Sequence, residues 1–171
     1  FGNEAGCKNF LTGTINRMMG TNNFLYRVDY YDDRGRVVQT RSTNHMGGYD
    51  FTYNAYDFTG NVTKTLKEHN IAGQPTVTEL YEYDYDHALR LKTTSYKLNN
   101  KPSVVLSSNT YDELGRLVEK KRHSNADTEE FEYNIRNWTT KIKSGNTFEQ
   151  NLYYNNLPSP YMNSAAQPCF N

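Results

Sequence analysis

The stretch Tyr111-Asp112-Glu113-Leu114-Gly115-Arg116-Leu117-Val118 predicts a tight turn that leads directly into a β-strand. Aspartate favours the first position of a type I turn, where its side chain accepts the backbone N–H two residues further on. Glycine favours the last position, where the backbone needs a positive φ that a β-carbon disfavours. We therefore expect residues 112–115 to reverse the chain and Leu117 to begin the returning strand.

Versions of this stretch recur along most of the chain, which indicates a repeat protein. Five segments align, and the tyrosines that open them are 25, 29, 26 and 22 residues apart. A sixth start, Tyr154-Asn155, follows after 21 residues and then loses the pattern. The five segments are Tyr31–Val38, Tyr56–Thr63, Tyr85–Lys92, Tyr111–Val118 and Tyr133–Thr140.

The predicted structural residues are the turn positions and the opening tyrosine of each segment. Asn134 and Asn137 replace Asp and Gly in the fifth segment, and asparagine both accepts local backbone hydrogen bonds and tolerates positive φ. Leu89 occupies the glycine position of the third segment, so we expect that turn to change its type or length. The turn residues are Asp32, Gly35, Asp57, Gly60, Asp86, Asp112, Gly115, Asn134 and Asn137, and the packing tyrosines are Tyr31, Tyr56, Tyr85, Tyr111 and Tyr133.

Between the turns the residues alternate with a period of two, as half-buried strands do. This predicts an all-β fold: an antiparallel meander of consecutive β-hairpins forming a curved, coiled sheet that buries a face of tyrosine, leucine and valine. We assign 1–23 to a lead-in that could add an edge strand, 24–156 to the repeats and 157–171 to an irregular tail. Strands are expected near 24–31, 36–42, 49–56, 61–68, 76–85, 90–97, 103–111, 116–123, 128–133, 138–143 and 147–154.

Composition excludes several functional classes. The 19 basic and 19 acidic residues cancel, so there is no electrostatic reason to expect a nucleic acid or an anionic membrane surface as partner. No apolar run is long enough to cross a membrane as a helix. The 15 tyrosines supply apolar surface that suits sheets with one solvated face, and we expect a folded chain.

The chain opens at Phe1 without a methionine or a signal-peptide pattern, and we expect it to be a processed product or a piece of something longer. Cys7 and Cys169 lie near opposite ends. The sequence leaves open whether they form a disulfide or remain as two thiols.

The repeated Tyr-Asp-x-x-Gly-Arg followed by Val or Leu resembles the YD-repeat of the RHS family. Tyr31–Val37 and Tyr111–Leu117 match that signature fully, and Tyr56–Val62 matches it with Asn61 in the arginine position. The resemblance covers about residues 24 to 156. The segments that link the repeats, such as 42–48, are similar to those of large RHS-like proteins of Bacteroidetes bacteria.

The resemblance implies a segment of a hollow shell wall. In that family a long β-meander coils into a strip, and full-length members enclose a C-terminal toxin; related shells occur in toxin complexes and teneurins. Five or six hairpins are too few to close such a shell, and the autoproteolytic core region has no counterpart here. We therefore expect a non-enzymatic structural module of a secreted or cell-surface bacterial protein, with the remainder of its own chain and a toxin domain as partners.

Motifs for catalysis or metal binding support no alternative function as strongly as the repeats support a structural module. Paired carboxylates invite a glycosidase hypothesis, but an Asp repeated at every turn is better explained by the turn. Alternating acids at 84 and 86 could bind calcium, whereas His45, His69, His87 and His123 lack the spacing of a zinc site and are expected in loops. No nucleophile elbow or phosphate-binding loop occurs. We expect no catalytic residues, no metal and no cofactor.

Two predictions concern surfaces. Exposed tyrosines near Asn, Asp and Arg could bind carbohydrate or a protein partner in adhesion, and the ligand-binding residues are unknown; the other explanation is a cross-strand tyrosine ladder. Trp138 is either a core residue or an anchor. An open sheet edge can pair with another chain, so we expect concentration-dependent homodimers.

Overall fold

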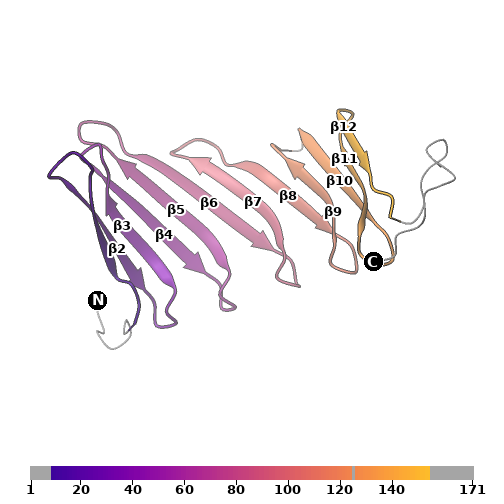
Figure 1. The fold of residues 1–171 in the computed structure, drawn as a ribbon, viewed down its shortest axis with the longest axis horizontal. Coiled ribbons are helices and arrows are strands. Elements are labelled where there is room, and N and C mark those ends of the chain that lie inside the picture. Colours follow the sequence, from indigo (N-terminus) through magenta and orange to yellow (C-terminus); the bar gives the residue numbers. More distant parts are fainter. Residues whose placement is uncertain (1–8, 125, 155–171) are drawn as a thin grey trace. The chain divides into compact units, whose positions relative to one another are not determined.

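The computed structural model describes residues 9–124 and 126–154 of the chain. Contacts divide it into two compact units, Phe1–Leu106 and Ser107–Asn171, and the division falls inside one strand. Each unit is described by itself. Figure 1 follows the chain from strand to strand in the order of the sequence.

The first unit is an antiparallel meander in which every strand pairs with the next one along the chain. Its strands are β1 (Gly13–Arg17), β2 (Phe24–Tyr31), β3 (Val37–Thr43), β4 (Tyr49–Tyr56), β5 (Val62–Asn70), β6 (Val77–Tyr85) and β7 (Leu91–Leu98). Short turns join consecutive strands, so sequence neighbours are also neighbours in the sheet (Figure 1).

The second unit repeats this arrangement. Its strands are β8 (Val104–Tyr111), β9 (Leu117–Arg122), β10 (Asp127–Tyr133), β11 (Thr139–Ser144) and β12 (Phe148–Asn151). The part of the chain that the structure describes contains no helix, and hence none that could cross a membrane. The predicted all-β meander of consecutive hairpins is confirmed.

The strand limits follow the predicted ones closely, with a few differences. β1 lies within the lead-in, and β12 stops at Asn151, short of the expected 154. β5 continues to Asn70, which places His69 in a strand and not in a loop as expected. The predicted tail 157–171 lies outside the described residues.

A β-bulge accompanies the opening tyrosine of every repeat. The register shifts between Tyr30 and Tyr31, and likewise immediately before Tyr56, Tyr85, Tyr111 and Tyr133. A type I turn followed by a residue of positive φ produces such a bulge, because one strand then contributes one residue more than its partner. The turn sequence therefore sets the register of each hairpin.

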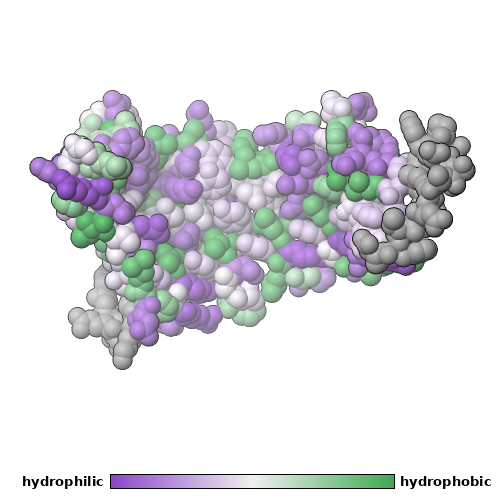
Figure 2. All heavy atoms as spheres, in the orientation of Figure 1, coloured by the Kyte–Doolittle hydropathy of each residue, from purple (hydrophilic) through white to green (hydrophobic). Residues whose placement is uncertain are grey.

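No hydrophobic side chain among the described residues is buried. The most protected side chains are polar, Asp29 and Thr65, each 9% exposed. Figure 2 shows hydrophobic and hydrophilic residues intermingled on the visible surface. The expected buried face of tyrosine, leucine and valine is therefore wrong for this part of the chain, because the strands of each unit form one layer and no described element packs on either face.

Strands β1 to β4 nevertheless have two chemically different faces. Side chains directly opposite in the register share a face, so Ile15 and Tyr26 lie on the same side as Arg41 and Phe51. The opposite side carries Asp29, Thr40 and Thr52. We call the first side the aromatic face; it consists of Ile15, Arg17, Phe24, Tyr26, Val28, Tyr30, Gln39, Arg41, Thr43, Tyr49, Phe51 and Tyr53.

Candidate functional site at the repeat junctions

The aspartate of each repeat organises its own turn. One carboxylate oxygen of Asp32 accepts hydrogen bonds from the backbone N–H groups of Arg34 and Arg36, both at 2.9 Å. The backbone closes the turn through Gly35 N–H to Asp32 C=O (3.1 Å) and Asp32 N–H to Arg36 C=O (2.9 Å). Asp57, Asp86, Asp112 and Asn134 each bond the backbone N–H four residues further on in the same way. Their predicted place in the turn thus has a direct structural basis.

The last turn position has a positive φ in all five repeats. Gly35, Gly60 and Gly115 adopt φ values of 75°, 100° and 83°, and Asn137 adopts 62°. Leu89 also adopts 62°, and Leu89 N–H bonds Asp86 C=O at 2.9 Å. The expectation that this turn changes its type or length is wrong: the aspartate and arginine contacts hold the loop, and the leucine takes the disfavoured conformation.

A turn of the same kind closes the link between β3 and β4, where a breaker-rich link that reverses the chain was predicted over 42–48 but not this turn type. Asn44 Oδ1 accepts from the backbone N–H of Met46 (3.1 Å) and Gly48 (2.8 Å). Gly47 supplies the positive φ, 75°. Gly48 is needed for space, because a β-carbon there would lie 1.9 Å from the carbonyl oxygen of Asn70. The signal was present in the sequence, since Asn44-x-x-Gly47 has the spacing of the Asp-x-x-Gly turns.

These hydrogen bonds favour the ionised aspartates. The side-chain bond from Thr59, with the backbone N–H groups of Gly60 and Asn61, lowers the pKa of Asp57 to about 2. The backbone N–H of Arg36 lowers the pKa of Asp32, and the equivalent group of Arg90 lowers that of Asp86. A low pKa suits neither a general acid nor a general base near neutral pH. The pattern is that of a turn anchor.

The opening tyrosine of a repeat ties it to the repeat before. The Tyr56 hydroxyl donates to Val37 C=O at 2.8 Å, and that of Tyr85 donates to Val62 C=O at 2.9 Å. In the second unit, Tyr133 donates to Leu117 C=O at 2.8 Å. The acceptor is always the first residue of the strand that leaves the preceding turn. Tyr111 ends β8, where it pairs with Leu117 beside the bulge.

The arginine that follows the turn glycine makes the second tie. Arg36 forms an ion pair with its own Asp32 (2.7 Å), while its guanidinium lies 4.6 Å from the centre of the Tyr56 ring. It also donates to Asp57 C=O at 3.2 Å. Its side chain therefore links one turn to the tyrosine and the turn of the next repeat.

Arg116 makes the same tie in the second unit. It pairs with Asp112 at 2.7 Å, covers the Tyr133 ring at 5.0 Å and donates to Asn134 C=O at 3.3 Å. In the second repeat Asn61 stands in the arginine position and bonds its own Asp57, at 3.2 Å. We refer to the tyrosine and arginine contacts together as the repeat junction.

Aromatic rings take the place of the arginine at both ends of the described repeats. The Trp138 ring packs against the Tyr154 ring at a tilt of 49° with centroids 4.9 Å apart, and the Tyr154 hydroxyl donates to Thr139 C=O at 2.8 Å. Phe10 stacks on Tyr31 at 4.9 Å, and the Tyr31 hydroxyl donates to Leu11 C=O. Trp138 is therefore a junction residue, and Tyr154, the sixth tyrosine of the series, still makes the junction hydrogen bond.

Sequence analysis thus found the Asp, Gly and Tyr positions but missed the role of the arginine. The signal was available, because Arg36, Arg90 and Arg116 each follow the glycine position directly. Trp138 also directly follows a glycine position, that of Asn137, but neither its residue type nor that of Phe10 belongs to the repeated pattern.

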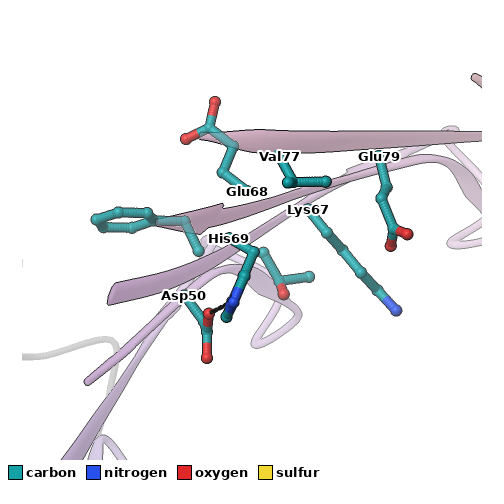
Figure 3. A pocket seen from close by; sticks show the side chains of 8 residues that line it. Asp50, Lys67, Glu68, His69, Val77 and Glu79 are labelled. Carbon is teal, nitrogen blue, oxygen red and sulfur yellow. Dashed lines mark hydrogen bonds and ion pairs between the residues drawn. The ribbon is translucent and has the colours of Figure 1, made fainter. Parts of the chain in front are cut away.

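A shallow hollow on the polar side of β4 to β6 is the other candidate site (Figure 3). The ring of His69 bonds the carboxylate of Asp50, its direct partner in the register, and both side chains are a little over 40% exposed. Lys67 and Glu79 project on the same side (Figure 3). Thr52 lines the hollow, but no hydrogen bond joins it to His69 among the described contacts. The pair lacks the activated nucleophile that acyl transfer needs.

The described residues include no group of three or more His, Cys, Asp or Glu side chains able to hold a metal ion. Asp86, one of the two acids considered for calcium, is bonded to its own turn and to Arg90. Cys7 and Cys169, whose pairing the sequence left open, lie outside the described residues. No family model matches the chain, and no curated protein sequence matches it either.

Proposed function

We propose that this chain is a non-enzymatic structural module, a YD-repeat segment of the kind found in RHS proteins. One observation carries the proposal: each residue type of Tyr-Asp-x-x-Gly-Arg takes part in the turn or in the repeat junction. Asp32 and Gly35 form the turn, and Arg36 joins it to Tyr56 of the next repeat. Residues that repeat because a turn repeats need no catalytic explanation.

The proposed role is mechanical. The strands of each unit form one layer, and the described residues include no buried apolar side chain. Each hairpin therefore depends on its neighbours, which satisfy its backbone groups. Such a module would serve as part of the wall of a large secreted or surface protein that encapsulates or displays a C-terminal toxin domain. The remainder of the parent chain would then be its main partner.

Hydrogen exchange on the full chain tests this proposal. In a mechanical repeat array, Arg36→Gln should raise exchange in β2 to β5, on either side of the altered junction, and leave β9 to β11 unchanged. Arg34→Gln is the matched control, since the Arg34 side chain makes one described hydrogen bond, to Phe58 C=O at an exposed turn, and no described ion pair or ring contact. Equal effects of the two variants would count against the junction as the basis of the function.

A carbohydrate-binding or partner-binding surface for adhesion is the second candidate. It is favoured by the large side chains that β1, β2 and β4 expose on the aromatic face, since tyrosine rings stack on sugar faces. A glycan array probed with the full chain tests it. A hit that Tyr49→Ser abolishes would support adhesion, and signals no higher than background would remove glycans as the ligand.

A further inference from the structure

The aromatic face of β1 to β4 has the size and composition of a docking surface. Six of its large apolar side chains are 40–65% exposed: Ile15, Phe24, Tyr26, Val28, Tyr30 and Tyr49. With about 100 Å² exposed on each, the patch measures roughly 600 Å², which is at the upper end for an exposed patch on a monomeric protein. Among the described residues, nothing packs on it.

Arg41 lies in the middle of this face. It is directly opposite Val28 on one side and Phe51 on the other. Its guanidinium lies 5.4 Å from the centre of the Tyr30 ring and 5.8 Å from that of Phe51. Residues on both neighbouring strands and Arg41 itself line one shallow groove. The rings thus hold a planar cation within an apolar surface.

Among the residues that the structure describes, the Arg41 guanidinium has no anionic partner. Arg27, Arg36, Arg90, Arg116 and Arg122 are all paired with a carboxylate in the described structure. Arg41 makes only its two ring contacts and no described hydrogen bond. On β5 the same side carries Glu68, the register partner of Phe51. The aromatic face of the four strands β1 to β4 holds two arginines, Arg17 and Arg41, and no Asp or Glu. Its charge is therefore positive, although the whole chain is neutral.

We propose that this face docks a polypeptide segment in which a carboxylate side chain is flanked by apolar residues. The carboxylate would bind the guanidinium of Arg41, whose fork geometry suits bidentate pairing, and the apolar flanks would cover Tyr26, Val28 and Tyr49. The inference does not depend on the chain being a YD-repeat wall. It depends only on the register and on the unpaired arginine.

A polypeptide fits this face better than a sugar. Sugar hydroxyls need several neutral hydrogen-bonding side chains beside the rings, and here Ile15 and Val28 are aliphatic. The hydroxyl of Thr43 is already used by the backbone N–H of Tyr26 at 2.9 Å. A second copy would bring the same arginines against each other, and the first acid on this side, Glu68, lies beyond Phe51 on β5, so charge complementarity favours a different, acidic segment.

Fluorescence anisotropy on the full chain tests the proposal with two labelled peptides. Both are nine residues long and rich in leucine and phenylalanine; one has a central glutamate and the other a central glutamine. We expect the glutamate peptide to bind at least about tenfold more tightly, which is the usual scale of one charge-assisted hydrogen-bonded pair.

Three variants and one control, Lys92→Gln, assign the preference for the glutamate peptide to Arg41. Arg41→Gln should bind the two peptides equally, and Arg41→Lys should restore part of the difference. Val28→Asp should abolish binding of the glutamate peptide, because the new carboxylate lies opposite Arg41, pairs with its guanidinium and repels the glutamate of the peptide. Lys92→Gln, a loss of the same charge at an exposed position of β7, should leave the tenfold difference intact. Circular dichroism would verify that each variant is folded.

Several outcomes would overturn the proposal. Equal binding of the two peptides by the unaltered chain would mean that no carboxylate is recognised. An undiminished difference in Arg41→Gln would place the recognition elsewhere. Failure of both peptides to bind at about 1 mM would also refute the proposal. Binding of an acidic oligosaccharide would then assign the face to a glycan, and dimers in sedimentation that Val28→Asp dissociates would assign it to a second copy.

Discussion

Removing a single hydroxyl at one repeat junction should measurably loosen the second unit. In Tyr133→Phe the ring remains beneath the Arg116 guanidinium, 5.0 Å away, and only the 2.8 Å hydrogen bond to Leu117 C=O is lost. A net hydrogen bond of this kind contributes about 0.5–1.5 kcal/mol. The loss should matter more than usual here, because no buried apolar side chain in the described residues contributes to stability.

The assay is native-state hydrogen exchange on β10 and β11, which reports local opening without assuming that the chain unfolds in one step. A loss of about 1 kcal/mol corresponds to roughly fivefold faster exchange of those amides that exchange only when the junction opens together with their strand. Tyr153→Phe is the control, since Tyr153 is 54% exposed and its hydroxyl has no described hydrogen bond. If the two variants exchange alike, the tyrosine hydroxyl does not hold the repeats together.

Three further predictions concern the turn glycine, the junction arginine and the effect of low pH. Gly115→Val should destabilise the second unit by about 1–3 kcal/mol, because valine is strained at φ 83°, whereas Leu114→Val at the exposed turn tip should change the unfolding midpoint in urea little. Arg36→Gln should cost roughly 1–2 kcal/mol from the lost ion pair and ring contact, and a cost no larger than that of Arg34→Gln would contradict the junction. The pKa of Asp57 is about 2 in the folded chain and 3.8 ordinarily, so its stabilisation is complete above about pH 4 and disappears as the pH falls through 2. Melting temperatures measured from pH 5 to pH 2 should therefore fall, and less steeply in Asp57→Asn; identical slopes would refute the assignment.

The third repeat shows why local patterns predict some conformations and miss others. A glycine-to-leucine change in isolation predicts a different turn, because leucine avoids positive φ. In the structure Asp86 still accepts the backbone N–H groups of Ala88 and Arg90, and Arg90 still pairs with Asp86 at 2.7 Å. Several contacts around one residue can outweigh a conformational cost of about 1–2 kcal/mol.

The sequence by itself determined the hairpins: the repeated Asp-x-x-Gly predicted the turns, and alternation predicted the strands that pair across them. Both are local properties, set by interactions within about five residues. Only the tertiary structure decided how Arg36 and Tyr56 join one repeat to the next, because their partners lie some 20 residues away. The tertiary structure also decided that no described element covers either face of the strands, and that Arg41 has no anionic partner among the described residues. A period of two assigns side chains to a face, but it does not say what, if anything, packs against that face.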